Sequence, residues 1–242
     1  MPPILQVDRI TKFFAGLAAL KDVTFDVEPG GIYGLIGPNG AGKTTLLSII
    51  AGSLRPTGGA VMFEGIDLTK KRSFGAAQVG VVRTHQIPRP FKSLSVLENV
   101  EVGLRFGRGR GAGNAVHETM QILERVGLAH AYRQSSARLS VGDLKRLELA
   151  RCLAARPSVL LCDEVCSGLT ELESGQVLDL LCDIRRSGTT ILYVEHNLKA
   201  IMKVCDRVIV MNYGQKLTEG LPQQVQNDPA VIEAYIGKPA GK

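Results

Sequence analysis

Short apolar runs of strand length occupy both ends of the chain. In one of them, Val23, Phe25 and Val27 alternate with polar residues, which is the period of a strand with one buried face. Thr170 with Glu173 forms a capping box at the start of a helical run. The remaining patterns predict strands at residues 4–14, 30–37, 60–65, 79–84, 158–164 and 189–196, a hairpin at 206–220 that turns at 212–214, and helices at 45–52, 170–188 and 229–238. Strands that alternate with helices in this way predict an α/β core.

The middle of the chain, from about residue 88 to residue 157, has a helical pattern instead. Ser95 and Glu98 form a capping box before an amphipathic stretch. A second helix is expected at 114–127, and a third begins near Ser140. The stretch GRGRGAG between the first two helices is too rich in glycine to pack, and we expect a mobile loop there. The chain therefore reads as an α/β core that holds a helical lobe.

The composition limits the classes of protein that fit. Of the 242 residues, 45% are hydrophobic and 21% are charged, so the chain can bury a core and is not globally disordered. The net charge of +6 favours anionic partners such as nucleotides, nucleic acid or an acidic membrane, and it fits a mildly basic soluble protein equally well. Five cysteines without a CxxC pair are expected to be reduced thiols. No apolar run approaches the roughly 20 residues that cross a bilayer, so any work at a membrane requires another chain.

A phosphate-binding loop follows the strand at 30–37. The stretch GPNGAGKT fits the pattern G-x-x-x-x-G-K-[ST], and it lies between a predicted strand and a predicted helix, which is the context that the motif needs. Backbone N–H groups of such a loop surround phosphates, Lys43 reaches the β- and γ-phosphates, and the hydroxyl of Thr44 can bind Mg²⁺. The expected phosphate site consists of Gly37, Pro38, Asn39, Gly40, Ala41, Gly42, Lys43, Thr44 and Thr45.

Two carboxylates end the apolar run at 158–164. A strand that ends there can lie beside the phosphate loop in an open α/β sheet, which would let Asp163 hold Mg²⁺ and Glu164 polarise the attacking water. A phosphate loop alone leaves a GTPase, a small-molecule kinase or an ATP-driven motor open. The NKxD pattern that reads guanine is absent from the sequence, which argues against a GTPase.

The stretch LSVGD, followed by LKRLELARCLAARP, reveals a resemblance. The chain resembles the ATP-binding subunits of ABC transporters, whose signature reads LSGGQ before a basic amphipathic helix, and the resemblance covers essentially the whole chain. It implies an α/β P-loop NTPase fold of the ABC type, with ATP and Mg²⁺ as ligands. The implied domain is single, with a RecA-like core and an antiparallel β subdomain at about 1–87 and 158–242, and a helical subdomain at about 88–157.

The resemblance also implies roles for individual residues. Phe14 matches the aromatic residue that stacks on adenine, with Phe13 as a rival for that role. Gln86 matches the glutamine that senses Mg²⁺ and the transmembrane partner. The remaining matches are Ser140 and Gly142 as signature residues that contact the γ-phosphate across a dimer interface, Thr44, Gln86 and Asp163 as Mg²⁺ ligands, and Glu164 and His196 as catalytic residues.

Three residues depart from the pattern of the family. Val141 and Asp143 stand where the signature commonly has Gly and Gln, and Thr170 stands where an aspartate is usual. Asp143 fits the third position of a capping box with Ser140, and its carboxylate would lie near an incoming γ-phosphate. These departures affect the hydrolytic site that two subunits share, and they leave ATP binding by Phe14 and the phosphate loop untouched.

Longer stretches narrow the resemblance to the ATPases of branched-chain amino-acid importers. They are RTHQIPRPFKSLSVLENVEVG, DEVCSGLT, VEHNLKAIMKVCDRVIVMNYGQ and VIEAYIGK. Lipopolysaccharide-export ATPases share part of the pattern, and a regulatory subunit with weak hydrolysis remains a second alternative. An ABC ATPase that acts on nucleic acid is disfavoured, since this chain has neither a second nucleotide domain nor a coiled-coil insertion.

The implied partners lie at a membrane. They are permease subunits, a second nucleotide-binding subunit of the same or another kind, and a solute-binding protein that acts through the permease, on the cytoplasmic face of the inner membrane. Candidate residues for the permease contact, which fit the core of the helical lobe equally well, are Phe91, Leu94, Val96 and Leu97. The sequence leaves open the solute, the direction of transport and the identity of the second subunit.

Overall fold

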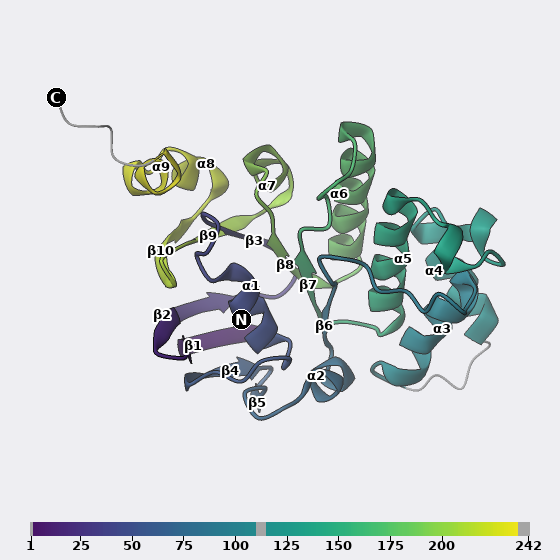
Figure 1. Cartoon of the computed structure of the whole chain (residues 1–242), viewed down its shortest axis with the longest axis horizontal. Helices are drawn as coiled ribbons and strands as arrows, with labels where there is room; N and C mark the ends of the chain where they lie inside the picture. The colour runs from purple at the N-terminus through teal and green to yellow at the C-terminus, as the bar shows by residue number, and fades with distance from the viewer. Residues whose placement is uncertain (1, 110–114, 237–242) are drawn as a thin grey trace.

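A mainly parallel sheet runs through the centre of the molecule (Figure 1). The computed structural model describes residues 2–109 and 115–236. Within them, this sheet has the order β10-β9-β3-β8-β7-β6, in which β10 pairs antiparallel with β9 and every other neighbouring pair is parallel. The strands are β3 (Ile32–Ile36), β6 (Val81–Arg83), β7 (Val159–Asp163), β8 (Thr190–Val194), β9 (Arg207–Asn212) and β10 (Gln215–Gly220).

A second, antiparallel sheet packs beside the first. Its order is β2-β1-β4-β5, and its strands are β1 (Leu5–Phe14), β2 (Leu17–Val27), β4 (Gly58–Phe63) and β5 (Ile66–Asp67). As the alternating pattern predicted, Val23, Phe25 and Val27 are buried while the residues between them are exposed. The sheet covers one face of the phosphate-loop helix α1 (Lys43–Ile50), which sits between the two sheets (Figure 1).

Three helices form the lobe at the far side of the molecule from β10 (Figure 1). They are α3 (Val96–Phe106), α4 (Ala115–Arg125) and α5 (Val141–Ala154), joined by the short helices η1 (Ala129–Ala131) and η2 (Ser136–Arg138). The capping box of Ser95 and Glu98 at the start of α3 is confirmed. The glycine-rich loop predicted at 107–113 lies mostly outside the described residues.

The remaining helices lie along the two sheets. They are α2 (Ser73–Val79), α6 (Glu171–Arg186), α7 (Leu198–Val204), α8 (Pro222–Gln226) and α9 (Pro229–Ile236). The capping box of Thr170 and Glu173 at α6 and the hairpin of β9 and β10 are confirmed. The helices α2, α7 and α8 were not predicted from the sequence pattern. Each spans only five to seven residues, which is too short for a helical period to stand out.

Successive residues of the parallel strands enter two different hydrophobic clusters. In β7, Leu160 and Cys162 pack with the helical side, while Val159 and Leu161 pack with α1 and the antiparallel sheet. This alternation explains why the strands read as continuous apolar runs, because both faces of a parallel sheet are covered. Because both faces are covered, polar side chains lie at the carboxyl edge of the sheet. No helix among the described residues has both the length and the apolar character that crossing a bilayer requires.

We expect the stability of the protein to depend on the buried face of β7. Leu161 is fully buried, and Leu161→Ala should lower the free energy of unfolding by about 2–5 kcal/mol because it removes apolar contacts and leaves a cavity. Leu172→Ala is the matched control, since that leucine is 75% exposed. Urea unfolding followed by circular dichroism measures both, and equal stabilities for the two variants would contradict the packing.

Candidate functional site

The candidate site lies at the carboxyl edge of the parallel sheet. The segments that follow β3, β6, β7 and β8 all meet there, because parallel strands that pair directly end on the same side. They bring together residues that are far apart in the sequence. The phosphate loop follows β3, and Gln86 follows β6. Asp163 and Glu164 lie at the end of β7, and His196 follows β8.

The phosphate loop has a backbone that only glycine allows at two positions. Gly37 has a φ of 148°, and a Cβ there would lie 2.1 Å from the carbonyl oxygen of Met211. Gly42 has a φ of 97°, and a Cβ there would lie 2.6 Å from Leu20 Cδ2. The loop is therefore pressed against β9 and β2 and leads directly into α1, so backbone N–H groups at the start of the helix are available to an anion.

A hollow of about 210 Å³ opens in front of this loop. Gly37, Pro38 and Ala41 are not among the residues that line it. The carbonyls of Gly37 and Pro38 accept hydrogen bonds from Lys43 Nζ at 2.7 and 2.9 Å. The lining consists of Ala19, Asn39, Gly40, Gly42, Lys43, Thr44, Thr45, Glu164 and His196.

Lys43 is the positive charge of this hollow. Its side chain is buried, and burial lowers the pKa of its ammonium, while the nearby charges of Glu164 and Asp163 raise it. Two backbone carbonyls are weak partners for a buried cation. An anion that enters the hollow would therefore gain the full attraction of Lys43, and the geometry suits a polyphosphate.

Asp163 is fully buried and pairs with an arginine that the sequence analysis did not single out. Arg83 Nη2 lies 2.6 Å from Asp163 Oδ2, and Arg83 Nη1 donates to Ser48 Oγ at 2.7 Å. Among the described residues, Asp163 Oδ1 is buried and has no hydrogen-bond partner. A buried carboxylate oxygen without a partner is costly unless something binds it, so this atom fits a ligand such as a hydrated divalent cation.

Glu164 is held by two side chains. Gln86 Nε2 donates to its Oε2 at 2.6 Å, and His196 Nε2 lies 2.6 Å from its Oε1. Glu164 also has a φ of 49°, in the left-handed region that costs a non-glycine residue about 1–2 kcal/mol. The sharp turn after β7 gives Glu164 a place in the lining of the hollow, so the strained backbone is coupled to the position of the carboxylate.

The signature residues lie at the N-terminus of α5. Ser140 Oγ accepts a hydrogen bond from the backbone N–H of Asp143 at 3.1 Å and donates one to Asp143 Oδ2 at 2.9 Å. The capping box expected here is thus only half formed, because the carboxylate bonds to the hydroxyl instead of the backbone N–H of Ser140. Gly142 packs against Glu173, where a Cβ would lie 2.7 Å from Glu173 Oε1.

Thr170, which stands where the family usually has an aspartate, has a local role at the start of α6. Its hydroxyl caps α6 by accepting from Glu173 N–H at 3.3 Å, and Glu173 Oε2 accepts from the N–H of Thr170 at 2.9 Å. Both threonine and aspartate are good capping residues. The departure from the family pattern therefore keeps the helix start intact.

Phe13 and Phe14 are equally exposed, at 46% each. Lys12 Nζ lies 5.1 Å from the centre of the Phe14 ring, and the backbone N–H of Phe13 donates to Thr57 Oγ1 at 3.1 Å. Both rings are thus accessible to a flat ligand, and their exposure does not distinguish which of them would stack on adenine. The assignment of Phe14 to adenine stays a prediction.

The structure adds two charged residues to the surroundings of Gln86. Lys145 Nζ, from α5, donates to the carbonyl oxygens of Gln86 and Glu164, and Glu148 accepts from the backbone N–H of His85. The sequence did carry a signal for them. Lys145, Glu148 and Arg151 recur every third residue along α5, which places these three charges on one helix face.

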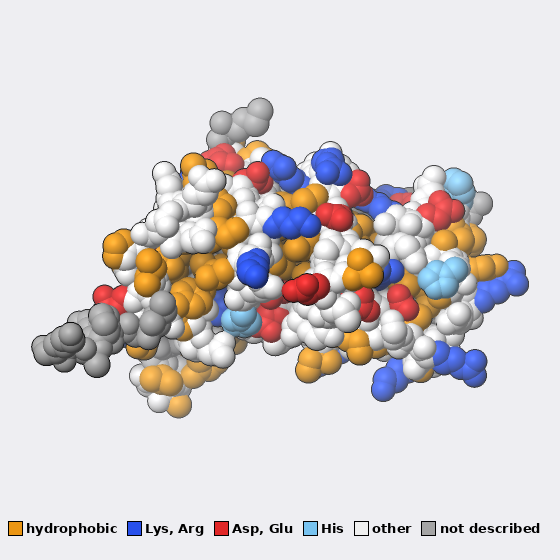
Figure 2. All heavy atoms as spheres, turned by 90° about the horizontal axis from the view of Figure 1, so that it is seen from above, with side chains coloured by type: hydrophobic (Ala, Val, Ile, Leu, Met, Phe, Trp, Pro, Cys, Tyr) orange, Lys and Arg blue, Asp and Glu red, His pale blue; other side chains and the backbone are white. Residues whose placement is uncertain are grey.

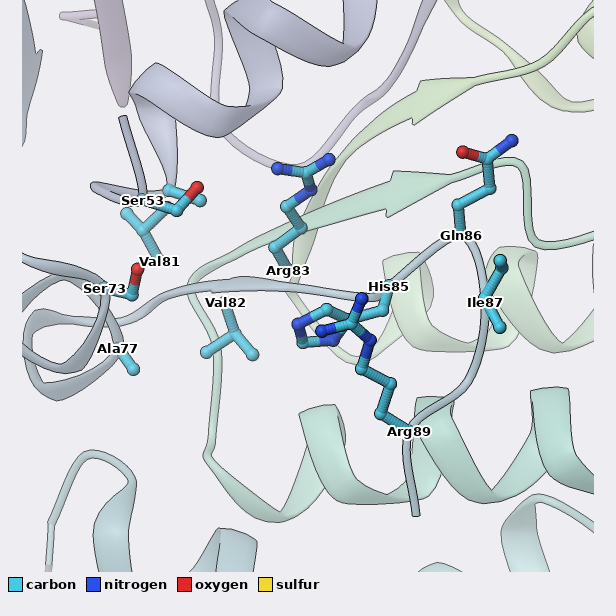
Figure 3. A pocket seen from close by; sticks show the side chains of 11 residues that line it. Ser53, Ser73, Ala77, Val81, Val82, Arg83, His85, Gln86, Ile87 and Arg89 are labelled. Atoms are coloured by element: carbon cyan, nitrogen blue, oxygen red, sulfur yellow. The ribbon is translucent and has the colours of Figure 1, made fainter. Parts of the chain in front are cut away.

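A second hollow, of about 450 Å³, lies beside the segment that follows β6 (Figure 3). In this view the side chains of Arg83 and Gln86 point to one side of the segment, while those of His85 and Arg89 lie on the other. Ile87 is 74% exposed at its rim. This surface shares no lining residue with the phosphate hollow, and its lining comes from α2, from β6 and the residues that follow it, and from Ala51 and Ser53 after α1.

Of the four residues considered for a permease contact, one is not accessible. Val96 is fully buried in the helical lobe, and Leu94 and Leu97 are partly buried. Phe91 is exposed, and its backbone is fixed by two hydrogen bonds with the side chain of Asn99, of 2.8 and 3.1 Å. Val96 belongs to the lobe core because it begins α3 and faces inward.

Comparisons with known proteins agree on one family. A model described as "ABC transporter" matches residues 20–167, and a model described as "Branched-chain amino acid ATP-binding cassette transporter" matches residues 215–241. The chain is 38% identical over 252 aligned residues to the high-affinity branched-chain amino acid transport ATP-binding protein LivG of Escherichia coli K12, covering 98% of each chain.

Solved structures give the same result. The chain is similar to an ATP-binding cassette of an ABC transporter solved in its ADP conformation, with a TM-score of 0.88 and 32% identity over 98% of this chain and 100% of the other. It is also similar to a cassette solved as a dimer in a post-hydrolysis state with ADP and phosphate, with a TM-score of 0.82 and 25% identity over 90% of this chain and 98% of the other.

We predict that Lys43→Ala weakens nucleotide binding at least roughly tenfold, because a hydrogen bond to a charged group contributes about 1.5–3 kcal/mol. Titration with a fluorescent ATP analogue measures the change, and the protein contains no Trp to interfere. Lys70→Ala is the control, since the Lys70 side chain is 90% exposed. Equal affinities in the two variants would refute the assignment of the phosphate site.

Proposed function

Since the chain belongs to the family of ABC transporter ATP-binding subunits, we propose that it hydrolyses ATP to drive the import of branched-chain amino acids or similar small solutes. The observation that carries the proposal is the convergence of Lys43, Asp163, Glu164 and His196 on one edge of the sheet. The similarity to LivG over nearly the full chain supports the class of solute, which is stated for that relative and inferred for this chain.

We assign the triphosphate of ATP to the hollow in front of the phosphate loop. Lys43 would exchange its two backbone carbonyls for the β- and γ-phosphates, and the backbone N–H groups at the start of α1 would surround the remaining oxygens. Phe14 is the proposed stacking surface for adenine. In this arrangement the phosphates are bound by the charge of Lys43 and by backbone N–H groups.

The residues proposed to hold Mg²⁺ are Thr44, Gln86 and Asp163. All three supply oxygen ligands, which is the chemistry that Mg²⁺ prefers, and the unpartnered Oδ1 of Asp163 fits such a ligand. When bound, Mg²⁺ supplies positive charge that neutralises the β- and γ-phosphates. Arg83 then has to share Asp163 with the cation or leave it.

Glu164 is proposed to act on the attacking water. As a carboxylate it can orient the water and accept its proton, and His196 beside it can stabilise the γ-phosphate as charge develops. Each carboxylate oxygen has one short contact, with Gln86 or with His196. These two side chains therefore set the orientation of the carboxylate relative to the attacking water.

A second nucleotide-binding subunit is proposed to complete each site. Ser140 and Gly142 lie at the start of α5 and would present a helix N-terminus to the γ-phosphate held by the other subunit. The cassette that was solved as a dimer with ADP and phosphate supports this assembly. Here the hydroxyl of Ser140 is bonded to Asp143, so an incoming phosphate has to compete with that carboxylate. We expect this competition to slow basal ATP hydrolysis.

The proposed location is the cytoplasmic face of the inner membrane, where permease subunits supply the spanning part. Phe91 and the hollow of about 450 Å³ beside the Gln86 segment form the surface proposed for the permease. Any solute-binding protein would act through that permease. On the face shown in Figure 2, Lys and Arg side chains are dispersed among Asp and Glu, which offers no support for a nucleic-acid partner.

We predict that Glu164→Gln slows ATP hydrolysis by roughly 10²- to 10⁴-fold, the usual contribution of a general base. The substitution keeps the shape and the bond from Gln86 Nε2 can be replaced by one to the new amide oxygen, so ATP affinity should be preserved. Phosphate release and nucleotide titration measure the two quantities. Hydrolysis at the parent rate would remove Glu164 from the proposed role.

We further predict that the protein copurifies with permease subunits when they are expressed together and extracted with detergent. Phe91→Ser should weaken this association without changing nucleotide affinity, because Phe91 is exposed and lies outside the phosphate hollow. Leu172→Ser serves as the control for loss of an exposed apolar side chain. Recovery of the parent chain with RNA instead of a membrane protein would overturn the transport proposal.

A further inference from the structure

One ammonium group bridges the backbones of two residues in the proposed hydrolytic site. Lys145 Nζ donates to the carbonyl oxygen of Gln86 at 2.7 Å and to that of Glu164 at 3.1 Å. The lysine is only 4% exposed, and burial lowers the pKa of its ammonium while Glu195 and Glu164 raise it. A buried cation is unfavourable unless it is well bonded, so these two carbonyls have to stay in place for the lysine to remain there.

The side chains of the same two residues are bonded to each other. Gln86 Nε2 donates to Glu164 Oε2 at 2.6 Å, and His196 occupies the other oxygen at 2.6 Å. Lys145 thus holds both members of the Gln86–Glu164 pair by their main chains. A general base needs a lone pair directed at the water it activates, and in this arrangement the contacts with Gln86 and His196 fix the direction in which the Glu164 carboxylate points.

A second contact from the same helix fixes the residue before Gln86. Glu148 Oε1 accepts from the backbone N–H of His85 at 3.2 Å and lies 2.9 Å from its Nδ1, while Glu148 Oε2 accepts from Arg151 at 3.1 Å. Burial alone would raise the pKa of Glu148, and the contacts with His85 and Arg151 outweigh it and bring the pKa below its ordinary value. The segment 85–86 is therefore attached to α5 at two points.

We propose that Lys145 is a positioning residue that clamps Gln86 onto Glu164 and keeps this carboxylate engaged until α5 moves. The proposal rests on the role of Glu164 put forward above. It also links the two sites of a dimer. Ser140, at the start of α5, would contact the ATP of the other subunit, whereas Lys145, only five residues further along the same helix, acts on Glu164 of its own subunit. At 1.5 Å per residue the separation along the helix is about 7.5 Å.

The physical consequence is a release mechanism. A shift or rotation of α5 moves the ammonium away from one of its two carbonyls, and the Gln86–Glu164 bond then loses the constraint that aligned it. The carboxylate of Glu164 is then free to turn toward the water that it activates. ATP that contacts the signature of one subunit would in this way activate Glu164 of that same subunit. Glu164 then acts on the ATP held by its own phosphate loop, which contacts the signature of the partner.

The test is Lys145→Met, which keeps the unbranched side chain as far as Cε and removes the ammonium with its hydrogen bonds. We expect the turnover number of basal ATP hydrolysis to rise about three- to tenfold with little change in KM, which corresponds to the loss of one typical hydrogen bond. Lys145→Arg retains a cation with several donors and should stay close to the parent protein. Lys70→Met controls for removal of a lysine elsewhere.

A measurement without nucleotide separates the clamp from the chemistry. Amide hydrogen exchange of residues 83–89, followed by mass spectrometry in the absence of ATP, should become faster in Lys145→Met and remain unchanged in Lys145→Arg. If Lys145→Met does not fold, Glu148→Gln should accelerate exchange in the same segment through loss of the second attachment. Parent-like exchange together with parent-like or lower turnover in the folded variants would overturn the proposal.

The double variant Lys145→Met with Glu164→Gln distinguishes failure of the clamp from failure of the proposed function. If the clamp acts through Glu164, the gain in turnover disappears in the double variant. If Glu164→Gln alone hydrolyses ATP at the parent rate, the role of Glu164 fails whatever Lys145 does. If Glu164→Gln is slow but Lys145→Met shows neither faster turnover nor faster exchange, only the clamp fails.

Discussion

Direct parallel pairing of β3 with β8, and of β8 with β7, is the constraint on which the rest of the site depends. Backbone hydrogen bonds fix the register, so the ends of these strands must lie at one edge. The phosphate loop, Asp163 and His196 meet for that reason and not because they attract one another. The charges gathered there repel in part, with two carboxylates next to each other, and the sheet holds them against that repulsion.

The buried charged groups at this edge bond to other groups of the protein, although Asp163 Oδ1 has no partner among the described residues. Lys43 bonds to carbonyls of its own loop, Asp163 pairs with Arg83, and Glu164 bonds to Gln86 and His196. In the proposed binding mode, phosphate replaces the carbonyls at Lys43, and the cation shares Asp163 with Arg83 or displaces it. The proposed binding is therefore an exchange of partners among buried groups.

The sequence was sufficient for features that depend on neighbouring residues. The capping boxes of α3 and α6, the β9–β10 hairpin and the phosphate loop each have their chemistry within a few positions, and the structure contains them. The sequence was insufficient for contacts between segments that lie far apart along the chain. Arg83 lies 80 residues from Asp163, and Lys145 lies 59 residues from Gln86, so neither contact has a local pattern. For Val96 the sequence left a partner contact and the lobe core equally open, because its burial is created by the packing of the lobe.

The strand order also constrains when the protein can become functional during its synthesis. The antiparallel sheet uses only residues 5–67, so it can form early as the chain leaves the ribosome. The phosphate loop follows β3, whose two sheet neighbours are β8 and β9, at residues 190–212. Until those strands have been translated, β3 has no partners in the central sheet and Gly37 has no β9 to pack against. Competence to bind nucleotide therefore arrives late, after the helical lobe has already emerged.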